Sequence, residues 1–104
     1  MEHDLGTHVV RLHGDLSLAD QKRIWSLLPP PETIGRLVLD CSDTTSMDSA
    51  IIVLIMRYRR RFMIAGRDPF EIVAIVPPRI ERLFELTGLT RAITVVPAAS
   101  VDKS

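Results

Sequence analysis

Hydroxyl and carboxylate side chains gather in one short stretch that follows a predicted buried strand and precedes a predicted helix. Its members are Ser42, Asp43, Thr44, Thr45, Ser46 and Asp48, and Ser49 follows directly. The first backbone N–H groups of a helix lack partners within the helix and favour anions. Either Asp48 or Ser49 is expected to be the N-cap of the helix. This stretch is the main candidate for a functional site.

The other reactive side chains form no catalytic or metal-binding pattern. The single cysteine, Cys41, ends a predicted strand and is expected to be a small buried apolar residue. His3, His8 and His13 have a spacing that establishes no metal site. No Gly-rich loop for a nucleotide and no acid–base pair or nucleophile triad is spelled out. We therefore expect a protein that is not an enzyme and that needs no metal or cofactor.

Length and charge limit the classes of protein further. We expect the 104 residues to form one domain over positions 1–104, with a flexible tail from position 97. The formal net charge is zero, which indicates neither nucleic acid nor an acidic surface as the general partner. One cysteine fits a reducing compartment. The polar N-terminal residues and the short apolar run from Ala50 to Met56 predict no signal peptide and no membrane insertion, so a cytoplasmic location is expected.

Strands and helices are predicted to alternate along the chain. Strands are expected at 1–5, 9–12, 36–40, 70–76 and 93–96, and helices at 18–28, 49–65 and 79–86. The first two strands would form a hairpin that turns at Gly6–Thr7 and ends at Gly14–Asp15. The strand at 70–76 is nearly all apolar, so burial on both faces is expected. The order predicts an α/β fold with a mainly parallel mixed sheet of about five strands, an N-terminal antiparallel hairpin and three to four helices.

The helix predicted from Ser49 to Ala65 has apolar residues on more than one side. Its core stripe is Ile51, Leu54, Ile55, Tyr58, Phe62 and Ala65, and its arginines mark the solvent side. Ile52, Val53 and Met56 lie toward the arginine side. Either a neighbouring element or a dimer partner buries these three residues, or they form an exposed apolar patch that binds another protein. The sequence leaves both alternatives open, including a homodimer.

Three segments in this order resemble the STAS domain, the family of sulfate-transporter tails and bacterial anti-sigma factor antagonists. Gly14–Asp15–Leu16 matches the family's loop after an early strand, and the stretch from Leu37 to Ser49 matches its strand, loop and helix start. The segment from Pro77 to Leu89, PPRIERLFELTGL, looks most similar to the sigma-regulator branch. The resemblance covers nearly the whole chain and implies a STAS-like fold and a non-enzymatic regulatory protein.

In antagonist members of this family, the domain binds an anti-sigma factor that is also a serine kinase, and phosphorylation at the helix start releases it. Their usual motif is Asp-Ser-Ser-Gly or Asp-Ser-Thr-Gly, with the second hydroxyl as phosphoacceptor. This chain reads Asp48-Ser49-Ala50-Ile51 instead. Ser49 is the remaining phosphoacceptor candidate, with a simple N-cap role as the alternative. A phosphate at the helix start would be partly stabilised there, while Asp48 and Asp15 would repel it.

The resemblance also implies a surface that binds a partner protein. Its predicted residues are Asp15, Thr45, Ser46, Asp48, Ser49, Ile52, Val53 and Met56. The expected partner is an anti-sigma factor or serine-kinase-like protein, bound constitutively if no hydroxyl is phosphorylated. The alternative is a STAS subunit of a lipid-transport ABC system, which packs its helix start against an ATPase without phosphorylation. Such members often read Asp-Thr-Ala-Gly, so the Ser49–Ala50 pair is compatible with them.

Overall fold

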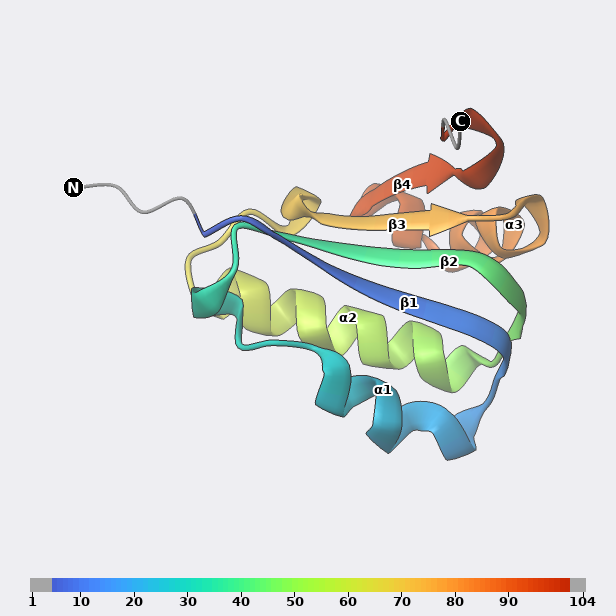
Figure 1. Ribbon diagram of the computed structural model, residues 1–104, viewed down its shortest axis with the longest axis horizontal. Coiled ribbons are helices and arrows are strands. Elements are labelled where there is room, and N and C mark those ends of the chain that lie inside the picture. Colours follow the sequence, from blue (N-terminus) through green and yellow to red (C-terminus); the bar gives the residue numbers. More distant parts are fainter. Residues whose placement is uncertain (1–4, 102–104) are drawn as a thin grey trace.

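The computed structural model describes residues 5–101, in which four strands alternate with three α-helices and short 3₁₀ turns (Figure 1). The strands are β1 (Thr7–Leu16), β2 (Arg36–Met47), β3 (Ile72–Val76) and β4 (Thr94–Pro97). The α-helices are α1 (Gln21–Leu27), α2 (Ser49–Ile64) and α3 (Pro78–Thr87). Residues 1–4 of the strand expected at 1–5, and residues 102–104 of the expected tail, lie outside the described range.

The four strands form one sheet in the order β1-β2-β3-β4, and every neighbouring pair is parallel. Within residues 5–101, the expected antiparallel hairpin and fifth strand are therefore wrong. The carbonyl oxygen of Gly6 accepts the N–H groups of Gly35 and Arg36, at 2.8 and 3.1 Å, which aligns the start of β1 beside the start of β2. The first connection is thus a crossover through α1, as parallel pairing requires.

All three α-helices lie on the same face of the sheet. Right-handed crossovers between strands in sequential order place each helix on that side. The buried face of the first three strands includes Val10, Leu12, Leu37, Leu39, Ile72, Ala74 and Val76. Val73 and Ile75 alternate with these residues and are only partly buried. The expected burial of this strand on both faces is therefore wrong, because no helix among the described residues covers the second face.

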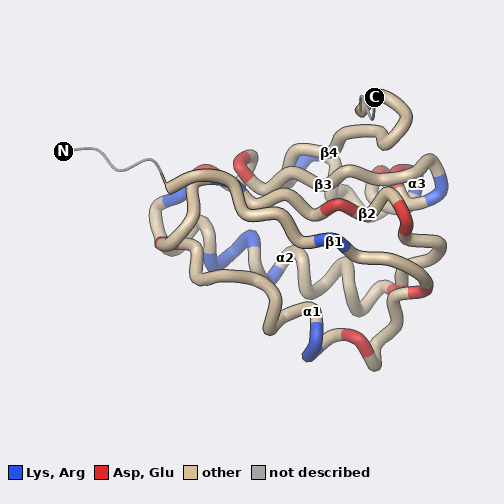
Figure 2. The backbone as a smooth tube through the Cα atoms, in the orientation of Figure 1, with Lys and Arg blue, Asp and Glu red and all other residues tan. Residues whose placement is uncertain are grey.

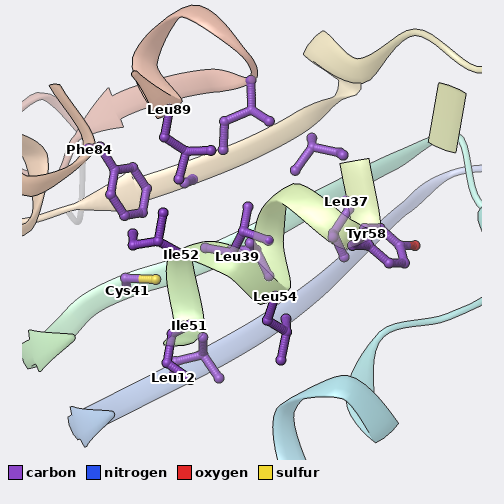
Figure 3. Packing of buried hydrophobic residues seen from close by; sticks show 14 of the residues in the cluster. Leu12, Leu37, Leu39, Cys41, Ile51, Ile52, Leu54, Tyr58, Phe84 and Leu89 are labelled. Carbon is purple, nitrogen blue, oxygen red and sulfur yellow. The ribbon is translucent and has the colours of Figure 1, made fainter. Parts of the chain in front are cut away.

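The central helix of the core is α2, and the core stripe expected for it is confirmed from Ile51 to Phe62. Figure 3 shows its side chains among those of the strands and of α3. The Tyr58 hydroxyl donates a hydrogen bond to the carbonyl oxygen of Pro29 at 2.6 Å. The Tyr58 ring also meets Trp25 edge-on, with the centroids 6.1 Å apart. These contacts hold α2 against α1 and the proline segment that follows it.

The ends of the helices follow the expected stop signals. Gly66 adopts a φ of 75° directly after the last turn of α2, a conformation that glycine accepts at little cost. The helix expected at 18–28 is a 3₁₀ turn, Leu18–Asp20, followed by α1. The Ser17 N–H donates to Asp20 Oδ2 at 2.8 Å at its start. None of the helices within residues 5–101 has the length and apolar character needed to cross a membrane.

Candidate partner-binding site

The polar stretch before α2 is a continuation of β2, so the expected loop at this position is wrong. β2 runs on to Met47 and pairs there with β1, which itself continues to Leu16. Thr44 is buried, and its hydroxyl donates to the Leu12 carbonyl oxygen at 3.3 Å. The hydroxyls of this stretch are therefore fixed by strand pairing rather than carried on a loose segment.

Two register shifts allow the pairing of β1 and β2 to continue this far. They lie between Arg11 and His13 and between Gly14 and Asp15 of β1, and β2 contributes one extra residue at each. Such bulges bend a strand and redirect its side chains. Gly14 has a φ of 75°, a left-handed conformation that a residue with a Cβ rarely adopts. The bulges bring Asp15 opposite the hydroxyl side chains at the end of β2.

Asp15 is the centre of an exposed hydrogen-bonded group. Its Oδ1 accepts the hydroxyl of Thr45 at 2.5 Å and the hydroxyl of Ser46 at 2.9 Å. The Thr45 bond first, and then the Ser46 bond, hold the pKa of the Asp15 carboxyl below its ordinary value of 3.8, because they stabilise the charged form. Three of the predicted site residues are thus brought together in a group that is charged at neutral pH.

Asp48 is the N-cap of α2, which decides between the two expected alternatives. Its Oδ1 accepts the backbone N–H of Ala50 at 3.2 Å, and its own N–H donates to the Leu16 carbonyl oxygen at 2.8 Å. Ser49 is the first helical residue, is exposed, and donates its hydroxyl to Asp48 Oδ1 at 3.2 Å. The start of α2 is therefore anchored to the end of β1, beside Asp15.

The start of α1 also reaches the site edge, which we define as the ends of β1 and β2 together with the start of α2. It does so through Gln21, a residue that the sequence did not single out. Gln21 Nε2 donates a hydrogen bond to the carbonyl oxygen of Ala50 at 3.3 Å. Ala50 itself is partly buried and presents only a methyl group. The helix starts of α1 and α2 thus meet at the position where antagonist motifs carry a hydroxyl.

The expected apolar patch on α2 is only partly present. Val53 and Met56 are exposed, with 53% and 39% of their surface accessible, but Ile52 is only 6% exposed. Figure 3 shows Ile52 pointing toward Phe84 of α3, within the core. The expected exposure of Ile52 is therefore wrong, because its side chain points into the core toward Phe84. The alternative in which a neighbouring element of the same chain buries all three residues is wrong as well, whereas burial by a dimer partner stays a prediction.

Cys41 matches its expected role as a buried apolar residue. It is fully buried, and this burial raises the pKa of its thiol to about 12, so that no reactive thiolate forms at neutral pH. Within residues 5–101, no group of histidine, cysteine, aspartate or glutamate side chains is arranged to hold a metal ion. The chemistry of the site edge is therefore that of hydroxyls, carboxylates and backbone N–H groups.

A groove that the sequence did not reveal lies between the end of β2 and α3. The groove has a volume of about 300 Å³. It is lined by Ser46, Met47, Arg79, Ile80, Arg82, Leu83 and Leu86. A signal was present, because the helix after each parallel strand starts at the carboxyl edge of the sheet. The helix that follows the strand at 70–76 therefore had to start at the same edge of the sheet as Ser46, which made α3 a predictable neighbour of Ser46.

Comparison with known proteins gives the family. No curated protein matches the chain at a significant level. A Thermotoga maritima protein provisionally described as an anti-sigma factor antagonist shares 20% identity and has a TM-score of 0.69, over 85% of this chain and 78% of that one. The anti-sigma factor antagonist SpoIIAA, in its unphosphorylated form, shares 17% identity and has a TM-score of 0.67, over 92% of this chain and 84% of that one. These structures show the same fold. The family model described as "Mlab, STAS domain" matches residues 1–97, and the chain therefore belongs to the STAS domain family.

Proposed function

We propose that this chain is a non-enzymatic regulatory domain that binds an anti-sigma-factor-like protein through the edge around Asp15, Asp48 and Ser49. The observation that carries the proposal is the exposed group in which Asp15 accepts two hydroxyls of β2 beside the capped start of α2. Binding groups held on strands and helix ends lose little entropy when a partner docks. Membership of the STAS family and a fold shared with two described antagonists support this function.

The lowered pKa of the Asp15 carboxyl fits a binding role better than a catalytic role. A general base that activates a hydroxyl works best when its pKa lies near the working pH. The two hydroxyl bonds instead lower the pKa of Asp15, which makes its carboxylate a weaker base. The same bonds leave acceptor positions on the Thr45 and Ser46 oxygens for donors of a partner. We therefore assign Asp15, Thr45 and Ser46 to partner recognition.

The regulatory part of the proposal concerns Ser49. Its hydroxyl is exposed at the first residue of α2, within reach of a kinase, while Ala50 offers no hydroxyl. A phosphate on Ser49 would gain from the positive end of the α2 dipole and would be repelled by the Asp48 carboxylate beside it. Phosphorylation at Ser49 would release the partner, and a chain without it would bind constitutively.

The test is the intact mass of the protein after incubation with ATP and an anti-sigma-factor kinase from its own genome. Ser49→Ala is the decisive variant, and Ser26→Ala is the matched control because Ser26 carries an exposed hydroxyl on α1, outside the proposed binding surface. A gain of one phosphate that only Ser49→Ala abolishes supports a switch at Ser49. Binding without any gain supports a constitutive binder. If the kinase neither binds the protein nor transfers a phosphate to it, the anti-sigma-factor proposal is refuted.

A second candidate is a STAS subunit of a lipid-transport ABC system that binds its ATPase partner. Two observations favour it: Ala50 occupies the usual phosphoacceptor position, and the description of the matched family names Mlab rather than a sigma regulator. Co-purification with a nucleotide-binding subunit, lost in Asp48→Lys, would decide for this candidate. Both candidates place the protein in the cytoplasm and use the same edge of the sheet.

A further inference from the structure

The solvent-facing side of α2 carries a continuous row of exposed residues. We define the α2 outer stripe as Val53, Met56, Arg57, Arg60, Met63 and Ile64. Successive helical residues are about 100° apart, so these six positions fall within roughly a third of the circumference of the helix. They lie opposite the buried side that contains Ile51, Tyr58 and Phe62. The stripe is therefore the part of α2 farthest from the core.

The apolar content of this stripe is high for a helix face that points to solvent. Val53, Met56, Met63 and Ile64 are 53%, 39%, 48% and 77% exposed. Ten large hydrophobic side chains are exposed among the described residues, and four of them lie in this six-residue stripe. The outer face of a surface helix normally carries polar and charged residues. A clustered exposed apolar surface is typical of a binding site.

The arginines of the stripe are not neutralised by their surroundings. Within residues 5–101, neither Arg57 nor Arg60 forms an ion pair with a carboxylate. The neighbouring arginines have contacts of their own. Arg59 donates to the Ala92 carbonyl oxygen at 2.8 Å, and the Arg61 guanidinium lies 5.5 Å from the centre of the Trp25 ring. Figure 2 shows the positive charges gathered in the second half of α2. The stripe is therefore apolar and positively charged, with no acidic residue in it.

We propose that the α2 outer stripe binds an amphipathic helix of the partner protein, with apolar side chains on its contact face and carboxylates beside them. Apolar residues at helical spacing on such a helix would pack on Val53, Met56 and Met63, while its carboxylates would pair with the two free arginines. Methionine is suited to this role because its flexible side chain adapts to different partners. From Val53 to Ile64 the stripe is about 17 Å long, or about three turns of a partner helix. The inference rests on the proposed function and names the partner element for the surface beside Ser49.

The charge of the stripe decides against two other occupants. A second copy of the chain docked on the same face would bring Arg57 and Arg60 against the same residues of its partner, without a carboxylate to separate them. An anionic membrane would attract the arginines, but helices that lie in a membrane surface carry bulky aromatic anchors on a continuous apolar face. The stripe has no aromatic residue, and Arg60 lies between its apolar members. An acidic helix satisfies both the apolar and the charged groups.

The test uses two labelled synthetic peptides and the full chain. Both peptides are stapled amphipathic helices with leucines at helical spacing, and the flanking positions are glutamates in one and lysines in the other. Fluorescence anisotropy gives the affinity of each peptide for the wild type, for Arg60→Glu and for Met63→Glu. Val9→Glu and Arg91→Glu are matched controls, because both residues are exposed and lie outside α2. Circular dichroism confirms that each variant is folded.

We expect the acidic peptide to bind the wild type at least about tenfold more tightly than the basic one. Arg60→Glu should reverse that preference, Met63→Glu should weaken both peptides, and the two controls should change neither. Equal binding of the two peptides, or no binding of either, would overturn the proposal. Co-sedimentation with vesicles of phosphatidylglycerol and phosphatidylcholine that stripe variants abolish, without a peptide preference, would also overturn it in favour of a membrane surface.

Binding measurements with the anti-sigma-factor protein distinguish a failure of this inference from a failure of the proposed function. If the partner binds the wild type, loses affinity for Asp15→Ala and binds Arg60→Glu and Met63→Glu normally, the proposed function stands and the stripe proposal is refuted. If no anti-sigma-factor protein binds the wild type, the proposed function fails, and the peptide titration alone decides for or against the stripe.

Discussion

Replacing Asp48 with alanine tests the start of α2 without disturbing the core. Asp48 is exposed, and its Oδ1 accepts the backbone N–H of Ala50 at 3.2 Å. Loss of an N-cap acceptor costs about 0.5–2 kcal/mol. The long hydrogen bond and the exposed position favour a value in the middle of that range, about 1 kcal/mol. For a domain of this length, that loss lowers the melting temperature by about 4–8 °C.

Urea unfolding followed by far-ultraviolet circular dichroism measures this free energy, and two further variants control it. Asp48→Asn keeps a side-chain acceptor and should lie within about 0.5 kcal/mol of the wild type. Ser49→Ala removes a hydroxyl that caps no backbone group, so it too should lie within about 0.5 kcal/mol. A stable Asp48→Ala would show that the side chain is not a cap. Equal losses for the asparagine and alanine variants would show that charge, and not the hydrogen bond, stabilises the helix start.

The same variants separate the structural role of Asp48 from a role in binding. If Asp48 acts only as a cap, Asp48→Asn retains the affinity for the partner protein. If its charge contacts the partner, Asp48→Asn weakens binding by about tenfold or more while the stability stays near that of the wild type. Surface plasmon resonance with the partner immobilised distinguishes the two results.

Three further predictions follow from burial in the core. Ile52→Ala should lower the free energy of unfolding by about 2–4 kcal/mol, because Ile52 is buried. Val53→Ala, at an exposed position, should cost less than about 1 kcal/mol in the same denaturation assay. Similar losses for the two variants would contradict the burial of Ile52. Burial raises the pKa of Tyr58 from 10.0 to about 12, so the folded state keeps a proton that the unfolded state releases. The Tyr58 contribution to stability should therefore be full below pH 10 and fall toward pH 12. Tyr58→Phe should make the alkaline loss of stability smaller, although part of it persists because the thiol of Cys41 also has a pKa raised to about 12. Ellman's reagent should label Cys41 only as fast as the protein unfolds, and prompt labelling of the native protein would refute its burial.

Local signals were sufficient for α2 and for the alternation of strands and helices, but not for the extension of β2 to Met47. The apolar period and the glycine after it predicted α2 to within one residue, and its core stripe from Ile51 to Phe62 follows the same period. The alternation of strands and helices predicted an α/β fold with parallel pairing. Three ordered motifs were enough to indicate the STAS family. Each of these features depends on residues close together in the chain, where helical and strand periodicity act directly.

Tertiary contacts decided what these elements present to a partner. Asp15 meets Thr45 and Ser46 only because two bulges shift the pairing of β1 and β2, and local sequence does not reveal register between strands. Ile52 is buried in the core with its side chain toward Phe84, while Val53, one residue later, stays exposed. Periodicity and stop signals along the chain were enough to place α2 and its first residue. Only the packing of distant elements decided which of its side chains reach solvent, because burial depends on neighbours far away in the chain.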